Sequence, residues 1–322
     1  MAFPVLRLAA CALLAVLSTS ATPASAQDSA PIKLIVGAPP GGTTDMVARG
    51  MAQYMAPILH RTLIVENRPG AGGNIAADYV AKSKADGNTL LVTFTSFSVN
   101  PSLYKNLPFD PIKDFTPISM LATVPSVLVV RKDFPARNMS EFIAQVKAHP
   151  GKYTAGIGAI GSSLHMAGER MKMMAGLDIR NIPYKGTNPA LTDLLGGQVD
   201  MMFASSVNVL QHVKSGSLRA LGVTSPQPLP EFPGVPPIGK TIPGFESSAW
   251  FGLLGPAKLP PATLATLTRA AREALQNPAF RKMLEREAAI PVGGSAADLA
   301  AFIRKDIARY AELVKYTGAK PE

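Results

Sequence analysis

Short apolar runs alternate with amphipathic segments along the first part of the chain. Strand-like runs occupy residues 32–36, 62–66 and 89–94. After the first run, apolar residues recur at the helical period and share one face: Val47, Met51, Tyr54, Met55 and Ile58. A loop through Asn74 leads into a second predicted helix that ends near Lys84. Residues 31–94 therefore predict the order β-α-β-α-β.

The same order recurs in the middle of the chain. Strands are predicted at 153–157, 181–184 and 199–204, and helices at 163–175 and 189–195. Gly176 follows the first helix and Gly196-Gly197 follows the second, as is typical of left-handed C-terminal caps. Asn188 and Pro189 indicate an N-cap followed by a proline in the first helical position. Strands that alternate with helices favour parallel sheets.

The remaining segments connect these two units. Residues 125–131 predict a buried strand that crosses from the first unit to the second, and 219–225 predicts the last strand of the second unit. The stretch 226–244 is rich in proline and glycine and has no period, which is typical of a surface connection. Residues 248–255 predict a returning strand. Three helices are then expected, opening at Pro260-Pro261, at Pro278 and at a capping box of Ser295 and Asp298.

This arrangement predicts an α/β protein of two lobes, each a mostly parallel sheet flanked by helices, with a hinge and a central cleft. Lobe 1 comprises residues 27–124 and 246–322, and lobe 2 comprises 125–245. Because both chain ends belong to lobe 1, few crossings join the lobes. Such a layout is typical of receptors that close about a hinge on a small molecule.

Residues 1–26 have the pattern of a secretory signal peptide. Arg7 precedes an apolar run, and small residues follow it and end in Ala24-Ser25-Ala26, an A-x-A cleavage site. The apolar run is too short to span a bilayer. Cys11 lies in a possible lipoprotein box, but the apolar core follows this cysteine, which favours an ordinary signal-peptide residue. We expect an exported mature chain that begins near Gln27.

Composition narrows the possible functions. Cys11 is the only cysteine, so the mature chain has no disulfide, and removing 26 of the 322 residues leaves 296, enough to bury a core. The net charge is +10, or +9 without Arg7, and the basic residues are interspersed with acids. Because no basic run is present, we expect no nucleic-acid binding. A basic exported protein better suits anionic small solutes or a membrane-bound partner.

Two glycine-rich turns carry the candidate chemistry. Each follows a predicted strand and opens a helix, where unpaired backbone N–H groups can hold an anion. Hydroxyl residues after the third strand of each unit should face the same cleft, because ligands bind beyond the carboxyl ends of strands in open α/β sheets. The candidate ligand-binding residues are Gly41, Gly42, Thr43, Thr44 and Asp45, then Gly161, Ser162, Ser163 and His165, and finally Thr95, Ser96 and Ser205.

The sequence supports anion binding at these turns better than three alternatives: a dinucleotide site, a serine nucleophile with a histidine base, and a metal site. Residues 156–161 match G-x-G-x-x-G, but the next strand ends in Tyr184-Lys185 instead of the acid that would hold a ribose. Ser162, Ser163 and His165 share one helical turn and generally point apart, and no G-x-S-x-G elbow is present. The four histidines are dispersed without metal-binding spacing. We therefore expect no catalytic residue, no cofactor and no metal.

Short motifs spread in order over essentially the whole mature chain resemble those of the Bug-type solute receptors of tripartite tricarboxylate transporters. These motifs are Pro40-Gly41-Gly42 with Asp45 and Arg49, residues 65–73, Asp86-Gly87, Gly161-Ser162-Ser163 with His165, Pro183 to Gly186, Leu195-Gly196-Gly197 with Asp200, Leu218 to Leu221, and Trp250 with Gly252 and Pro256. The resemblance implies a two-lobed, type II-like periplasmic binding protein fold. It adds Tyr184 and Asp200 to the candidate ligand-binding residues, and implies that a small carboxylate is handed to a cognate membrane permease.

The sequence as a whole predicts a monomeric extracytoplasmic receptor, not an enzyme, that binds a small carboxylate in the interlobe cleft. Two alternatives stay open: an exported enzyme acting on a small anion in the same cleft, and a ligand-reporting partner of a membrane sensor. Catalysis requires a positioned nucleophile, base or metal, whereas binding requires donors and a closing hinge, and the residues indicate only the latter.

Overall fold

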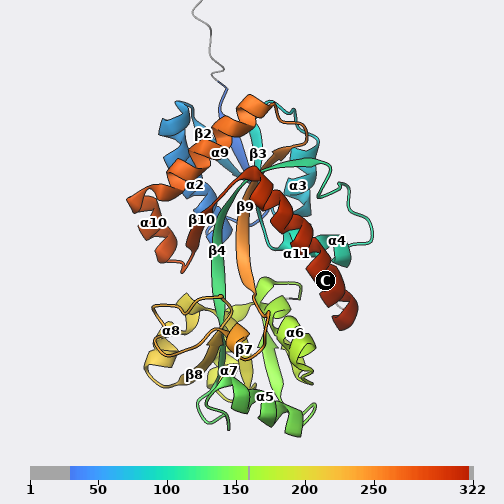
Figure 1. Cartoon of the computed structure of the whole chain (residues 1–322), viewed down its shortest axis with the longest axis vertical. Helices are drawn as coiled ribbons and strands as arrows, with labels where there is room; N and C mark the ends of the chain where they lie inside the picture. Colours follow the sequence, from blue (N-terminus) through green and yellow to red (C-terminus); the bar gives the residue numbers. More distant parts are fainter. Residues whose placement is uncertain (1–29, 159, 319–322) are drawn as a thin grey trace, which may run out of the picture.

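The protein folds into two α/β lobes that lie one above the other. In the computed structural model, which describes residues 30–158 and 160–318, the lobes are joined by β4 (Phe115–Arg131) and β9 (Ser248–Pro256) (Figure 1). The predicted signal peptide, Cys11 and the mature start at Gln27 lie outside the described residues. Within those residues, no helix combines the length and apolar character needed to cross a membrane.

The upper lobe, lobe 1, is built on a mixed sheet. Its strands follow the order β2 (Leu63–Asn67), β1 (Ile32–Val36), β3 (Thr89–Phe94), β9 and β4, with β10 (Ile290–Gly293) also paired to β4. β1 is parallel to β2 and β3, whereas β9 is antiparallel to β3 and β4. The predicted strand at 89–94 is therefore confirmed, and the returning strand lies at the centre of this sheet.

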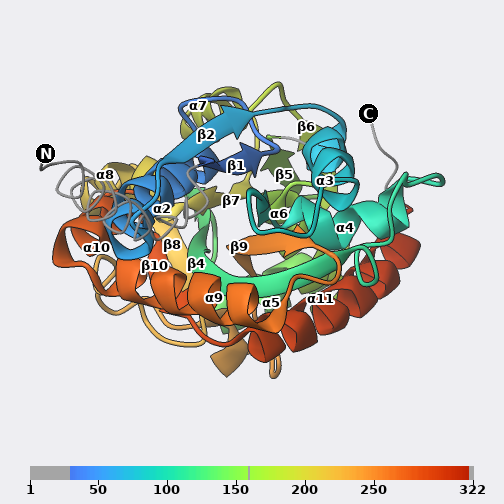
Figure 2. The same cartoon turned by 90° about the horizontal axis from the view of Figure 1, so that it is seen from above.

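Helices cover both faces of the lobe 1 sheet. They are α2 (Thr43–Leu59), α3 (Asn74–Ala81), α4 (Ser96–Leu103), α9 (Pro261–Gln276), α10 (Pro278–Glu285) and α11 (Ala296–Thr317). α2, α9 and α10 share a core with Leu34, while α3, α4 and α11 pack on the side of Ile35 and Trp250. Leu34 and Ile35 face opposite ways because side chains alternate along a strand. Figure 2 shows α2 and α10 to the left of the sheet and α3 and α4 to the right.

The lower lobe, lobe 2, repeats this plan on a smaller scale. Its strands are β5 (Thr154–Ile157), β6 (Arg180–Pro183), β7 (Met201–Ser205), β8 (Leu218–Val223) and the second half of β4. β5 is parallel to β6 and β7, whereas β4 is antiparallel to β7 and β8. α5 (Met139–Ala148) and α6 (Ser163–Ala175) cover one face, and α7 (Thr187–Leu195) and α8 (Ser206–Lys214) cover the other.

β4 belongs to both sheets. Up to Pro125 it pairs with β9, where Pro125 lies opposite Ser248, and from Ser126 it pairs with β7, where Ser126 lies opposite Ser205. The connections also hold the 3-10 turns η1 (Ala71–Gly73) and η2 (Ile238–Lys240). The change of partner between Pro125 and Ser126 marks the point where the chain leaves lobe 1.

The C-terminal helix makes a second contact between the lobes. α11 begins with a capping box in which Ser295 and Asp298 bond reciprocally, so the predicted cap is confirmed. Near the other end of α11, Tyr310 and Val314 pack against Met166 of α6 in one buried cluster. Figure 1 shows α11 descending along lobe 1 toward lobe 2. A rotation of one lobe against the other therefore also has to shift this helix contact.

Several elements differ from the sequence predictions. β4 is 17 residues long and begins at Phe115, ten residues before the predicted crossing strand at 125–131. The sequence did not predict its first part because Pro117 and two register irregularities obscure the alternation of apolar and polar residues there. The sequence did not predict α4, α5, α8 or β10. The prediction of Asn188 as an N-cap is wrong: the N-cap of α7 is Gly186. Pro189 is tolerated in the first helical turn because N–H groups there lack intrahelical acceptors.

Candidate functional site

The first glycine-rich turn folds back on itself through Asp45. Gly41 has a φ of 87°, a value that favours glycine, and its N–H donates to Asp45 Oδ2 at 3.0 Å. Asp45 also accepts from Arg49 Nε at 2.8 Å and from Asn67 Nδ2 at 2.9 Å. Burial alone would raise the pKa of Asp45, but these hydrogen bonds outweigh burial and hold the pKa below its usual range. The carboxylate therefore shapes the turn from inside lobe 1.

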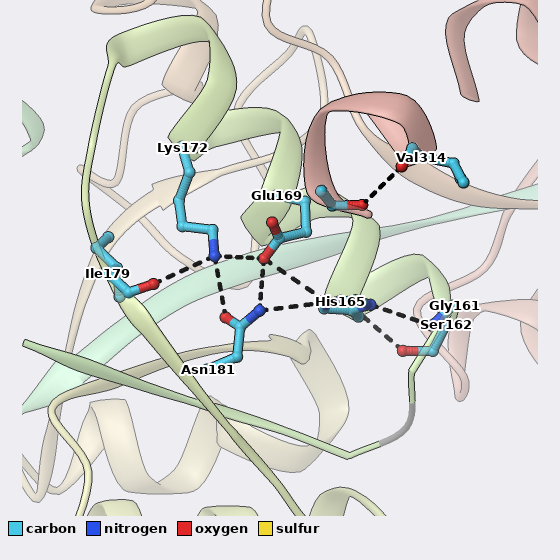
Figure 3. Close-up of polar contacts among 9 residues, drawn as sticks. Gly161, Ser162, His165, Glu169, Lys172, Ile179, Asn181 and Val314 are labelled. Atoms are coloured by element: carbon cyan, nitrogen blue, oxygen red, sulfur yellow. Dashed lines mark hydrogen bonds and ion pairs between the residues drawn. The ribbon is translucent and has the colours of Figure 1, made fainter. Parts of the chain in front are cut away.

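The second turn, at the start of α6, has the same construction. Gly161 has a φ of 76°, and its N–H donates to His165 Nδ1 at 3.0 Å (Figure 3). Ser162 is the N-cap, and its hydroxyl oxygen accepts from the backbone N–H of His165 at 3.2 Å. The ring of His165 is buried, which lowers its pKa; Glu169 opposes that shift, and Lys172 adds to it.

Both turns contribute to a cavity of about 290 Å³ between the lobes, which we call the front cavity. Its polar lining consists of hydroxyl residues: Thr43, Thr44, Thr95, Ser96, Ser126, Ser162, Ser163, Ser205 and Ser247. Its apolar lining comprises Phe94, Val124, Pro125, Leu164, Ala249 and Phe251. Among the described residues that line it, none carries a charge. A ligand there meets hydroxyls, backbone donors and a few apolar surfaces.

Four helices of the described chain begin at the front cavity. Thr43 opens α2, Ser96 opens α4, Ser163 opens α6, and the lining residue Ser205 is the N-cap of α8. The first N–H groups of a helix lack intrahelical acceptors, and its N-terminus carries roughly half a positive charge. In the described structure, the N-cap side chains of α4 and α8 make no capping hydrogen bond. The cavity is therefore suited to an anion without any cationic side chain.

Several of the lining hydroxyls already have protein partners. Besides Ser162, the hydroxyl of Ser126 donates to Thr224 Oγ1 at 3.3 Å, and two threonines are also bonded. The hydroxyl of Thr43 donates to Glu287 Oε2 at 3.1 Å, and the hydroxyl oxygen of Thr95 accepts from the backbone N–H of Trp250 at 3.0 Å. Thr95 consequently ties the start of α4 to β9. These contacts fix the orientation of both threonines at the cavity wall.

Other predicted ligand-binding residues do not line the front cavity: Gly41, Gly42, Asp45, Gly161, His165, Tyr184 and Asp200. The hydroxyl of Tyr184 donates to Asp193 Oδ2 at 2.7 Å, and burial together with this carboxylate raises the pKa of Tyr184 to about 12. Asp200 accepts from Arg131 Nε at 3.0 Å and from the N–H of Thr154 at 2.8 Å. Both side chains therefore brace lobe 2, and the glycines, Asp45 and His165 support the turns.

The sequence analysis missed the part of the lining that comes from the strands between the lobes. Ser126 on β4 and Ser247 directly before β9 bring two hydroxyls, and Phe251 on β9 brings an aromatic ring; Phe94, at the end of β3 in lobe 1, brings another. A usable signal was present for the serines, because Ser126 lies within a predicted crossing strand and Ser247 directly precedes the predicted returning strand. A strand that connects two lobes must pass the cleft, so its polar residues are candidates for the cleft wall.

A second cavity of about 380 Å³, which we call the rear cavity, lies on the other face of the crossing strands. Along β9, Ala249 and Phe251 line the front cavity, whereas Ser248 and Trp250 line the rear cavity. This division follows from the alternation of side chains along a strand. A larger depression of about 510 Å³ is lined by α9 and the first residue of α11 only. The front cavity is the better candidate site because it combines both lobes with several helix N-termini.

Comparison with known proteins agrees with this geometry. Residues 47–319 match the tripartite tricarboxylate transporter family receptor. Protein BugT of Bordetella pertussis is 39% identical over 293 residues, which cover 90% of each chain. The structure of the periplasmic binding protein BugD matches with a TM-score of 0.71 and 34% identity, covering 91% of this chain and 99% of that one.

Two further similar structures were solved with ligands. Rpa4515 of R. palustris with adipate has a TM-score of 0.74 and 32% identity, covering 91% of this chain and 98% of its own. MatC (Rpa3494) of Rhodopseudomonas palustris with bound malate has a TM-score of 0.70 and 31% identity, covering 88% of this chain and 98% of its own.

The two-lobed α/β fold and the cavity between its lobes define a solute-binding protein of the periplasmic type, which confirms the predicted two-lobed fold class. The expectation of mostly parallel sheets is wrong, because β4 and β9 run antiparallel to their neighbours and make both sheets mixed. The chain belongs to the tripartite tricarboxylate transporter receptor family, so the resemblance noted in the sequence is also confirmed. Members of this family are receptors that serve a membrane transporter.

Proposed function

We propose that this protein captures a small carboxylate in the front cavity and delivers it to the permease subunits of a tripartite tricarboxylate transporter. The observation that carries the proposal is the set of helix N-termini and hydroxyls around a cavity whose described lining has no charged side chain. Backbone donors of this kind stabilise an anion without the cost of burying a separate cation.

The proposed ligand class is a dicarboxylate of four to six carbons. α2 and α4 begin on the lobe 1 side of the cavity, and α6 and α8 begin on the lobe 2 side. One carboxylate can therefore bind each lobe, and a ligand that contacts both lobes favours the closed arrangement by its differential affinity for it. The malate of MatC and the adipate of Rpa4515 fall within this class.

We propose binding without catalysis. The hydroxyl of Ser162 accepts the backbone N–H of His165, and the ring of His165 accepts the N–H of Gly161. A serine nucleophile would instead need its hydroxyl bonded to the ring of a histidine base. Neither residue is arranged for nucleophilic attack, which supports a receptor.

We also propose that residues 1–26 are removed and that the mature periplasmic chain is a monomer. Its lobes comprise residues 27–124 with 246–322, and 125–245. The partner change of β4 between Pro125 and Ser126 supports the first boundary, and the start of β9 at Ser248 supports the second.

Thermal unfolding with malate, adipate and matched monocarboxylates tests the proposed function. At 100 times its dissociation constant, a ligand stabilises the folded state by about 2.7 kcal/mol, enough to raise the melting temperature measurably. We expect the dicarboxylates to raise it and the monocarboxylates to raise it much less. Equal stabilisation by a monocarboxylate would overturn the dicarboxylate assignment, and no response to any carboxylate would overturn carboxylate binding.

A further inference from the structure

The two turns at the front cavity share one construction, offset by 120 residues along the chain. In each, a glycine with positive φ donates its N–H at 3.0 Å to the side chain four residues later: Gly41 to Asp45, and Gly161 to His165. A second residue, four positions further on, then contacts that acceptor. Arg49 bonds Asp45 at 2.8 Å, and Glu169 lies 3.6 Å from Nε2 of His165.

The two acceptors differ in their chemistry. A carboxylate with a lowered pKa, such as Asp45, accepts a hydrogen bond throughout the neutral and mildly acidic range. An imidazole nitrogen accepts only while it carries no proton. Because the N–H of Gly161 points at Nδ1, the ring of His165 must be neutral with its proton on Nε2, which faces Glu169.

The surroundings of His165 favour this neutral form. Glu169 is buried and bonds Lys172 Nζ at 2.5 Å and Asn181 Nδ2 at 2.7 Å, so its charge is already balanced by Lys172 (Figure 3). Glu169 and Lys172 on α6 are the charged groups that act on the ring, and β6 adds the uncharged amide of Asn181, 3.4 Å from Nε2. α11 packs against the same helix through Tyr310, Leu313 and Val314.

We propose that His165 is a positioning residue for the ligand site, whose neutral ring holds the Gly161 turn in its binding shape and whose protonation in acid releases that turn and weakens ligand binding. The proposal rests on the proposed function. A protonated Nδ1 would place two donors 3.0 Å apart at Gly161, and the turn would have to move. Ser162 and Ser163 follow directly and line the cavity, so they would move with it, while the first turn would keep its shape.

Two substitutions at His165 separate this role from simple packing. His165→Asn offers an uncharged amide oxygen to Gly161, as Asp45 offers a carboxylate oxygen to Gly41, but it does not titrate. His165→Phe fills the buried space without any acceptor. His149→Asn is the matched control because His149 is an exposed histidine at the end of α5.

The test measures adipate and malate affinity by calorimetry from pH 8 to pH 5. We expect the affinity of the wild type to fall more than that of His165→Asn over this range, by a factor that grows as the pH decreases, and His149→Asn to follow the wild type. His165→Phe should bind at least tenfold more weakly than the wild type at pH 8. Identical pH profiles of the wild type and His165→Asn, or full affinity of His165→Phe, would overturn the proposal while leaving the proposed function intact.

NMR of the ligand-free protein distinguishes the failure of this inference from failure of the proposed function. If neither dicarboxylate binds at any pH, the proposed function is overturned, and the amide signal of Gly161 decides the inference. A shift of that signal that follows the titration of the His165 ring supports the positioning role. A Gly161 amide signal whose position does not change as the His165 ring titrates overturns the positioning role.

Discussion

The indole N–H of Trp250 donates to Asp306 Oδ2 at 2.9 Å, inside lobe 1. Trp250 is fully buried on β9, and Asp306 is 2% exposed on α11, where Arg309 also bonds its carboxylate. This contact ties a strand that crosses between the lobes to the helix that touches α6. Burial raises the pKa of Asp306, although Arg309, Ser98 and Trp250 oppose the shift.

Replacing Asp306 tests how strongly this contact holds α11 to the sheet. We expect Asp306→Ala to lower the free energy of unfolding by about 3 kcal/mol, because it leaves the buried indole N–H of Trp250 without its acceptor and removes the carboxylate partner of the half-buried Arg309. Asp306→Asn keeps an acceptor for Trp250 and should cost less. Urea unfolding followed by the fluorescence of Trp250, the only tryptophan, measures both. Equal stability of the two variants would show that the hydrogen bond contributes little.

The pH dependence of stability tests the Asp45 contacts. The folded-state pKa of Asp45 is lowered, so its contribution to stability is present above its unfolded pKa of about 3.9 and is lost as the pH falls through the folded pKa. Asp45→Asn keeps an oxygen for Gly41 but cannot ionise. We expect this variant to be less stable than the wild type at pH 7 and the difference to shrink below pH 4. A difference that is constant with pH would contradict the charge assignment.

The sequence predicted the helix starts at α2 and α6 because glycines and capping residues mark them. It did not predict α4 or α8, although their first residues, Ser96 and Ser206, directly follow the lining residues Thr95 and Ser205. α4 is eight residues long with Pro101 inside, so no helical period is visible. The site was therefore predicted as two anion-binding turns, and the remaining helix starts emerged only from tertiary structure.

Ligand-binding residues that were predicted from family motifs alone do not line the front cavity, whereas those predicted from their positions after strands do. Tyr184 and Asp200 were included for the family resemblance, and both bond other residues of lobe 2. Thr95, Ser96 and Ser205 were included because they follow strands, and all three line the front cavity. A motif indicates that a residue matters in a family, but a position after a strand also indicates where its side chain lies.

A proline at the start of α6 tests the backbone donors. Ser163→Pro removes one N–H at the cavity together with the Ser163 hydroxyl, so its affinity is compared with that of Ser163→Ala, which loses the hydroxyl alone. The helix tolerates the proline because the first helical position needs no intrahelical acceptor and Ser162 is already extended, with ψ of 158°. We expect dicarboxylate affinity to fall about tenfold or more, as for a lost hydrogen bond to a charged group. Ala296→Pro, at the same position of α11, is the control and should bind normally. Full affinity of Ser163→Pro would exclude this donor from the site.

Neighbouring residues of β9 provide a test of hinge closure. Ser248 lines the rear cavity and Ala249 lines the front cavity, so a phenylalanine at each position fills a different space. The crossing strands lie between these cavities, and closing the front around a ligand should widen the rear. Ser248→Phe should then oppose opening, whereas Ala249→Phe should occupy the space that the ligand needs.

We accordingly expect opposite effects from the two substitutions. Ser248→Phe should raise dicarboxylate affinity by up to about tenfold, because a closed form that is already populated no longer has to be formed at binding. Its radius of gyration without ligand, measured by solution scattering, should approach that of the liganded wild type. Ala249→Phe should abolish binding and leave the radius near that of the ligand-free wild type. Weaker binding by Ser248→Phe with an unchanged radius would show that the rear cavity does not open as the lobes close, and that closure follows another axis.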